Sequence, residues 1–182
     1  LDFYYVCYDN EAYGNTGMQL SPATPYGART ATSPCSLQHP SGASQEKKDI
    51  FEIWRAHKPP YIATVAPRYP LDLEEKFARA AAFTGPKMFL ALAACPTGWL
   101  YDPGETPEVA KLAVETGLWP LKEAINGVVT HTYIPKRKPV EAYLKLQGRF
   151  RHLFEPAVQA DAIQHIQTRV DAYWERATRE GS

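Results

Sequence analysis

Near its start the sequence carries a stretch in which an apolar run gives way abruptly to small, amide and acidic residues: Tyr4-Tyr5-Val6-Cys7-Tyr8-Asp9-Asn10-Glu11-Ala12-Tyr13-Gly14-Asn15-Thr16-Gly17. Aromatic and β-branched side chains favour a β-strand, and we expect the run to form a buried one. The two glycines that follow let the backbone approach a ligand closely. Because ligands in open α/β sheets bind beyond the carboxyl ends of the strands, residues 9–17 are predicted to form a ligand loop.

This loop offers oxygen ligands of the kind that one class of metal ion prefers. Asn10 carries a neutral side-chain oxygen, and the peptide carbonyls around Ala12 supply more. A hard cation such as Mg²⁺ suits these oxygens, with a ligand's phosphates completing its coordination. Asparagine and glycine are also the usual turn residues, so the pattern alone leaves an ordinary loop as the alternative.

The middle of the chain alternates between helical and extended patterns. The expected elements are a helix from Gln45 that ends before Pro59, a strand over residues 61–65, a helix over residues 71–81 entered through Pro70, and a strand over residues 88–94. Strands that alternate with helices in close succession indicate right-handed βαβ units and a parallel sheet. The predicted fold class is therefore α/β.

Cys95 follows the last of these strands directly, in a Pro-Thr-Gly turn. The topology places it on the same edge of the sheet as Asn10. A lone cysteine after an apolar run is most often a small buried hydrophobic residue. Its position at a strand end favours another role, because a 4Fe–4S cluster takes four thiolates, some of which can come from distant segments.

The carboxyl-terminal third predicts a helix, a hairpin, a basic arm and a second helix. The helix covers residues 106–116 with Thr106 as its cap, and Asn126-Gly127 is the turn of a hairpin over residues 121–134. A basic arm, residues 135–139, is expected to be solvated surface. The last helix, residues 158–174, carries an apolar stripe that must bury against this domain or a partner, formed by Ile163, Ile166, Val170 and Tyr173.

Composition narrows the function classes. The 182 residues are 45% apolar and carry 20 acidic and 20 basic groups, which argues against a nucleic-acid partner. There is no signal peptide and no run long enough to span a membrane, so we expect a cytoplasmic protein. Three widely separated cysteines argue against a disulfide framework. Residues 19–44 are predicted to form a long irregular loop, in which Cys35 and His39 have no assigned role.

Several motifs together resemble one family. They are the run from Tyr8 to Gln19, Ser21-Pro22-Ala23-Thr24-Pro25-Tyr26-Gly27-Ala28, Cys95-Pro96-Thr97-Gly98-Trp99, the run from Leu112 to Leu121, and the run from Lys138 to Phe150. The sequence resembles, to about Leu153, the thiamine-diphosphate-binding beta subunit of the 2-oxoacid:ferredoxin oxidoreductases, the pyruvate synthase family. The fold this implies is a partial thiamine-diphosphate-binding sheet with a carboxyl-terminal hairpin, basic arm and helix.

The resemblance assigns roles to the loop and to Cys95. Asn10 becomes a side-chain Mg²⁺ ligand and Ala12 a main-chain Mg²⁺ ligand, while Asn15 lies close to the thiazolium and the substrate as the catalytic residue. Thr16 and Gly17 bind the cofactor with them, and Cys95 resembles the last ligand of a 4Fe–4S cluster.

Two positions depart from the family. Asn10 stands where other members carry threonine, which also supplies an oxygen. Gly14 replaces a larger residue, so the pocket floor beside Asn15 is expected to be roomier or differently shaped.

The implied activity is oxidative decarboxylation of a 2-oxoacid, pyruvate foremost, to acyl-coenzyme A and carbon dioxide, with electrons passed through 4Fe–4S clusters to ferredoxin or a similar acceptor. Three alternatives stay open: the same chemistry on phenylglyoxylate or another 2-oxoacid, a thiamine-dependent decarboxylase without iron–sulfur chemistry, and a non-catalytic assembly subunit.

The family's Gly-Asp-Gly segment and cysteine-rich start are not in this sequence, so we expect it to be a carboxyl-terminal portion of such a subunit. Residues 1–134 would form the thiamine-diphosphate and Mg²⁺ domain, without its amino-terminal part. Residues 135–182 would form an arm and a helix packing on that domain or on partner subunits of the alpha and gamma/delta type. Expressed alone, the chain is expected to be insoluble or partly unfolded.

Overall fold

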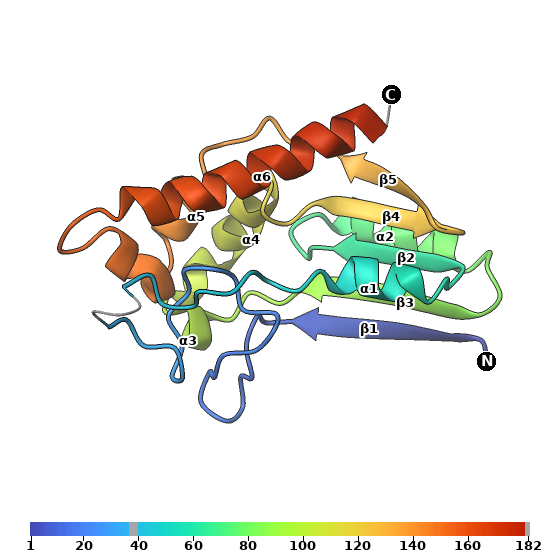
Figure 1. Ribbon diagram of the computed structural model, residues 1–182. Coiled ribbons are helices and arrows are strands. Elements are labelled where there is room, and N and C mark those ends of the chain that lie inside the picture. The colour runs from blue at the N-terminus through green and yellow to red at the C-terminus, as the bar shows by residue number, and fades with distance from the viewer. Residues whose placement is uncertain (37–39, 181–182) are drawn as a thin grey trace.

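The computed structural model describes residues 1–36 and 40–180, so His39 lies outside the described residues. Its centre is a five-stranded sheet in the order β1-β3-β2-β4-β5 (Figure 1). The first three strands are parallel, and β4 and β5 extend the sheet as an antiparallel hairpin. The strands are β1 (Phe3–Asp9), β2 (Tyr61–Val65), β3 (Pro86–Leu92), β4 (Leu121–Ile125) and β5 (Val128–Tyr133). The predicted α/β class is confirmed. The antiparallel pairing of the hairpin with β2 was not predicted.

Two helices cover opposite faces of the sheet. α1 (Ile50–Ala56) packs Phe51 against Ile62, whereas α2 (Pro70–Ala80) packs Phe77 and Ala80 against the next residue of β2, Ala63. Side chains along a strand alternate between its faces, so the two contacts lie on opposite sides. Figure 1 shows α1 in front of the sheet and α2 behind it.

The helix expected from Gln45 starts later, at Ile50. Asp49 stands directly before it, and its side-chain oxygen accepts a hydrogen bond of 3.0 Å from the amide of Glu52. That is the geometry of a helix N-cap, which fixes the first turn at this point. Pro70, in contrast, begins α2 as predicted.

The expectation that β1 is a buried strand is wrong for this chain. β1 is hydrogen-bonded only to β3 among the strands of the described sheet, and its other edge is open. As a result Tyr5 is 47% exposed and Tyr8 is 77% exposed. The composition of the run predicts a strand, but whether a strand is central or at an edge depends on its neighbours.

The larger hydrophobic cluster joins Leu90 and Leu92 of β3 and Leu121 of β4 to a group of helices and turns. Its elements are α3 (Pro96–Trp99), a 3₁₀ turn (Pro103–Glu105), α4 (Thr106–Glu115), α5 (Glu141–Leu144), a 3₁₀ segment (Gly148–Leu153) and α6 (Ala160–Glu180). Thr106 does not cap α4 as predicted. It is already in the helix, and its hydroxyl donates to the carbonyl of Pro103.

The stripe on α6 is buried within this chain. Ile163, Ile166 and Val170 are each 7% exposed or less and join the same hydrophobic cluster as α4. Trp174, not Tyr173, completes the stripe, and its indole donates to the carbonyl of Gly117. Of the two surfaces expected to bury the stripe, this domain or a partner, the structure shows the first. The division of the chain at residue 134 stays a prediction.

The connection from β1 to α1 is irregular over its described part, residues 10–36 and 40–49. This confirms the irregular loop predicted over residues 19–44 as far as those residues are described. It contains no helix or strand there, only isolated bridges between Tyr13 and Gln19 and between Thr30 and Ser33. None of the helices in the described residues combines the length and the apolar character that a membrane span needs.

Candidate functional site

Asn10 and Cys95 follow neighbouring parallel strands, as the sequence predicts. β1 and β3 pair as far as Asp9 and Leu92, and the amide of Ala93 donates to the carbonyl of Asp9 at 3.0 Å. The chain beyond each strand therefore leaves from the same edge of the sheet. A further contact joins the two segments, because the indole of Trp99 donates to the carbonyl of Asn10 at 2.9 Å.

The predicted ligand loop is a closed turn with two levels. Backbone hydrogen bonds between Tyr13 and Gln19 close the turn. Asn10 and Ala12 lie below these hydrogen bonds, where the Asn10 side-chain oxygen accepts a hydrogen bond of 3.3 Å from the Ala12 amide. The exposed tip holds the other predicted site residues, Asn15, Thr16 and Gly17. The loop thus brings all five predicted cofactor-binding residues into one turn.

A buried charge cluster lies behind this turn. Lys47 Nζ is 2.7 Å from a carboxylate oxygen of Asp9 and 2.7 Å from one of Glu11. The second oxygen of Glu11 accepts a hydrogen bond of 2.6 Å from the Arg149 guanidinium. Burial would raise the pKa of Glu11, but the charges of Lys47 and Arg149 outweigh it and hold that pKa below its usual value. Burial would lower the pKa of Lys47, but Glu11 and Asp9 raise it.

These ion pairs decide which oxygens of the loop a cation could bind. The carboxylates of Asp9 and Glu11 are both engaged by cationic side chains, which leaves the neutral oxygens of Asn10 and of the peptide carbonyls. Neutral oxygens fit Mg²⁺, but one loop cannot fill about six coordination positions, so phosphates and other residues must complete them. Within residues 1–36 and 40–180, no group of three or more His, Cys, Asp or Glu side chains is placed to hold a metal ion.

Gly14 faces Asn10 across the turn. A Cβ atom at Gly14 would stand 2.7 Å from the Asn10 side-chain nitrogen, closer than such atoms approach without a shift. A side chain at position 14 would therefore require the Asn10 amide to shift, so the two positions that depart from the family contact each other across the turn. The roomier pocket floor beside Asn15 stays a prediction.

Cys95 lies half-buried at the start of α3. Its sulfur accepts a hydrogen bond of 3.4 Å from the amide of Gly98, and its carbonyl accepts one of 2.8 Å from the amide of Trp99. An amide donor to sulfur stabilises a thiolate, so the turn fits a cluster ligand. Cys7 and Cys35 are free thiols as well. A 4Fe–4S cluster would need further thiolates from elsewhere.

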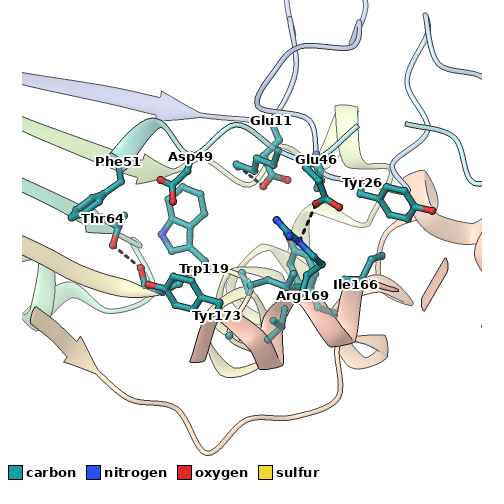
Figure 2. A pocket seen from close by; sticks show the side chains of 18 of the residues that line it. Glu11, Tyr26, Glu46, Asp49, Phe51, Thr64, Trp119, Ile166, Arg169 and Tyr173 are labelled. Carbon is teal, nitrogen blue, oxygen red and sulfur yellow. Dashed lines mark hydrogen bonds and ion pairs between the residues drawn. The ribbon is translucent and has the colours of Figure 1, made fainter. Parts of the chain in front are cut away.

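A cavity of about 330 Å³ lies on the inner side of the charge cluster. Figure 2 shows Glu11 on one side of it, Trp119 near its centre, and Ile166, Arg169 and Tyr173 of α6 on the opposite side. The Lys47 ammonium lies 5.1 Å from the centre of the Trp119 ring. The cavity and the ligand loop thus share Glu11.

Sequence reasoning missed Lys47 and Arg149. Arg149 falls within the motif from Lys138 to Phe150 that carries the resemblance, so it could have been singled out as a charged residue in a motif of unassigned role. Lys47 carries no such signal, since it lies next to Lys48 in a polar segment.

The fold is that of a thiamine-diphosphate-binding domain. Residues 1–90 match the family described as thiamine pyrophosphate enzyme, C-terminal TPP binding domain. The match covers the ligand loop, α1, β2 and α2 and runs into β3.

Curated relatives narrow the class. The chain is 46% identical over 171 residues to the pyruvate synthase subunit PorB of Methanocaldococcus jannaschii, covering 93% of this chain and 55% of the relative. It is 49% identical over 152 residues to the PorB subunit of Methanothermobacter marburgensis, covering 83% and 52%. It is also 41% identical over 178 residues to the ketoisovalerate oxidoreductase subunit VorB of Pyrococcus abyssi, covering 96% and 55%. The chain belongs to the family of thiamine-diphosphate-binding beta subunits of the 2-oxoacid:ferredoxin oxidoreductases, and it spans about half the length of the curated relatives it matches.

A solved structure gives a weaker match. The 2-oxoglutarate:ferredoxin oxidoreductase of Magnetococcus marinus aligns over 60% of this chain and 43% of that chain, at 19% identity and a TM-score of 0.43. That likeness is too low to bear on function.

Proposed function

We propose that this chain binds thiamine diphosphate and Mg²⁺ in an enzyme complex that oxidatively decarboxylates a 2-oxoacid to acyl-coenzyme A and carbon dioxide. The observation that carries the proposal is the arrangement at one edge of the sheet. The loop offers neutral oxygens for a cation because its carboxylates are paired with Lys47 and Arg149. The half-buried thiol of Cys95 lies at the same edge of the sheet. The named relatives favour pyruvate as the substrate.

In this proposal each residue has a stated task. Asn10 and the Ala12 carbonyl hold Mg²⁺, Thr16 and Gly17 contact the cofactor, and Asn15 contacts the substrate. Thiamine diphosphate, when bound, supplies the addition to the 2-oxoacid carbonyl and accepts the electron pair that loss of carbon dioxide leaves. Cys95 contributes one thiolate to a 4Fe–4S cluster through which electrons leave for ferredoxin or a similar acceptor.

Partner subunits are part of the proposal. The open edge of β1 leaves unpaired backbone groups beside exposed aromatic residues such as Tyr8, and such an edge pairs readily with another chain. A monodisperse, cooperatively melting monomer of residues 1–182 would argue against it. A cytoplasmic location stays a prediction from the sequence.

The cofactor assignment is tested by titrating thiamine diphosphate and Mg²⁺ into the complex after removal of both. Asn10→Ala is expected to weaken binding, because one of about six coordination positions is lost. Asn10→Thr is the matched control, since it keeps a side-chain oxygen, and should bind more tightly than Asn10→Ala. Equal cofactor retention by all three proteins would overturn the assignment.

The iron–sulfur assignment separates this reading from a decarboxylase without clusters. Cys95→Ser in the complete complex should lose iron and the resonance of the reduced cluster nearest the thiamine, because serine replaces a thiolate poorly. Cys35→Ser, which removes another half-buried thiol, is the matched control. Full iron content in Cys95→Ser would make Cys95 a structural thiol.

Substrate choice needs a separate test, because the ketoisovalerate relative shows that similar chains belong to enzymes named for different 2-oxoacids. Turnover of a panel that includes pyruvate, ketoisovalerate, phenylglyoxylate and 2-oxoglutarate, with coenzyme A and an artificial acceptor, would decide it. We expect pyruvate to give the highest kcat/KM.

A further inference from the structure

We propose that Glu11 is the positioning residue of the ligand loop. Its carboxylate, clamped between Lys47 and Arg149, sets the oxygens of Asn10 and Ala12 on either side of it. The inference rests on the proposed function, because positioning has meaning only if those oxygens bind a ligand. It goes further by assigning a task to charges that no part of the reaction uses.

The backbone at Glu11 adopts an uncommon conformation. Its φ of 61° lies in the left-handed region, which residues with a Cβ seldom adopt. Such a conformation persists only when the surroundings over-determine it. Here the Glu11 amide donates to Asp9 Oδ1 at 2.9 Å, and the Glu11 carbonyl accepts a hydrogen bond of 2.7 Å from the Thr24 hydroxyl. Both peptide groups at Glu11 are therefore held.

The side chain of Glu11 is held at both carboxylate oxygens. The Glu11 and Arg149 side chains are 7% and 4% exposed, so their contact of 2.6 Å is shielded from water. Charge-assisted hydrogen bonds in such surroundings are shorter and stronger than neutral ones. Lys47 holds the other carboxylate oxygen. Two cations from separate segments thus fix both oxygens of one residue, which fixes the direction of the backbone on either side of it.

Arg149 is itself held in place by further contacts. Its Nε donates to Gln147 Oε1 at 2.9 Å, and its guanidinium lies 3.9 Å from the centre of the Trp99 ring. The Trp99 indole in turn donates to the Asn10 carbonyl. The contacts form a closed ring from Asn10 through Glu11, Arg149 and Trp99 back to Asn10. This ring ties the ligand loop to the turn that carries Cys95.

Substitution of an ion pair that only stabilises the fold should have a different effect from substitution of a positioning residue. Loss of a stabilising pair lowers the melting temperature and leaves affinity nearly unchanged. Loss of a positioning residue lowers affinity for the ligand that it helps to hold. Lys76 and Asp72 supply the comparison: Lys76 is fully buried, its Nζ lies 2.7 Å from Asp72, and both belong to α2 rather than to the loop.

The test uses the assembled complex with its thiamine diphosphate and Mg²⁺ removed, and measures their binding by calorimetry together with the melting temperature. Glu11→Gln keeps the size of the side chain and removes its charge, and should weaken binding about ten- to a hundredfold, the range for residues that orient metal ligands. Asp72→Asn should lower the melting temperature while binding changes less than about twofold. Arg149→Lys, which keeps the charge but loses the contact of the guanidinium with the Trp99 ring, should weaken binding to an intermediate extent.

The outcomes separate this inference from the proposed function. If the wild-type complex binds no thiamine diphosphate at this chain, or if Asn10→Ala binds as the wild type does, the proposed function fails. If Asn10→Ala weakens binding but Glu11→Gln and Arg149→Lys bind normally, only the positioning role fails. Equal losses of affinity in Glu11→Gln and Asp72→Asn would also overturn it. Should Glu11→Gln fail to assemble, Arg149→Lys decides by the same comparison.

Discussion

Glu11 and Glu123 are both buried carboxylates, yet they lie on different kinds of backbone. Glu11 stands in an irregular loop with a left-handed φ of 61°. Glu123 stands in β4, where it is paired with Ala63 of β2 and Thr130 of β5. A strand between two neighbours is held by its hydrogen-bond ladder, whereas a loop has none. The ion pairs of Glu11 therefore hold a backbone that has no hydrogen-bond ladder. The ion pair of Glu123 adds to a ladder that already holds the backbone.

Their partners differ in the same way. Arg149, which pairs with Glu11, is buried and cannot turn to solvent. Arg79, which donates to Glu123 at 3.1 Å, is 37% exposed and also contacts Glu75. The remaining partner of Glu123 is the neutral phenol of Tyr61. Removal of Glu11 leaves the buried Arg149 without its carboxylate partner. Removal of Glu123 leaves Arg79, which water can reach.

The largest effect is expected for Glu11→Ala. Breaking a buried ion pair by removing one partner costs about 3 to 5 kcal/mol, and here the loss falls on the loop. Hydrogen exchange of the assembled complex should show faster exchange of the amides in residues 10–18, with unchanged protection of Tyr61–Val65. Uniform loss of protection in both segments would contradict the comparison.

Glu123→Ala should have a smaller effect, about 1 to 3 kcal/mol, which is the cost of leaving the Tyr61 hydroxyl without its partner. The loss should appear in the exchange of β2 and β4, and affinity for thiamine diphosphate should stay at the wild-type value. Glu123→Gln, which retains an acceptor for the phenol, is the matched control and should lose less. A loss of cofactor affinity in Glu123→Ala would erase the distinction between the two glutamates.

The stability that Tyr61 contributes should depend on pH. Burial raises the pKa of the Tyr61 phenol well above its ordinary value of 10.0, and the hydrogen bond to Glu123 and its charge raise it further. Because the folded-state pKa is raised, the contribution of the phenol to stability is complete below pH 10 and falls as the pH rises beyond it. Tyr61→Phe should be less stable than the wild type by about 1 kcal/mol near neutral pH. Thermal unfolding at several pH values should show that gap narrowing above pH 10, and a constant gap would contradict the shift.

The smallest effect is expected for Arg79→Gln. A half-exposed arginine that pairs with Glu123 and Glu75 contributes about 0.2 to 1 kcal/mol, and salt screens that contribution. The melting temperatures of variant and wild type should therefore converge as the salt concentration rises. A large, salt-independent loss would mean that Glu123 depends on its cation as Glu11 depends on Arg149.

The regular elements of the sheet could be predicted because each depends on nearby residues. Pro70 marks the start of α2, and Asn126 and Gly127 adopt the positive φ values, 49° and 85°, that a two-residue hairpin needs. The exposure of β1 could not be predicted, because a strand becomes central or peripheral through partners elsewhere in the chain. The antiparallel pairing of β4 with β2 escaped prediction for the same reason.

The residues of the candidate site also differ in how far the sequence predicts their positions. Asn10 and Cys95 could be placed on one edge because strand polarity is encoded in the alternation of elements. The contacts of Glu11 could not, since Lys47 and Arg149 lie 36 and 138 residues away along the chain. The α6 stripe is an intermediate case: its spacing predicts a buried face, but the identity of the surface that covers it is a property of the folded chain.

The position of β1 also has a consequence for synthesis on the ribosome. Its first pair joins Phe3 to Pro86, so β1 emerges long before the strand that binds it within this chain. At about 5 to 20 residues per second, the interval lasts roughly 4 to 17 seconds. During that time four aromatic side chains, those of Phe3, Tyr4, Tyr5 and Tyr8, have no strand from this chain beside them. The order of synthesis therefore separates β1 in time from the strand that pairs with it, so β1 cannot take its place in the sheet until β3 has been made.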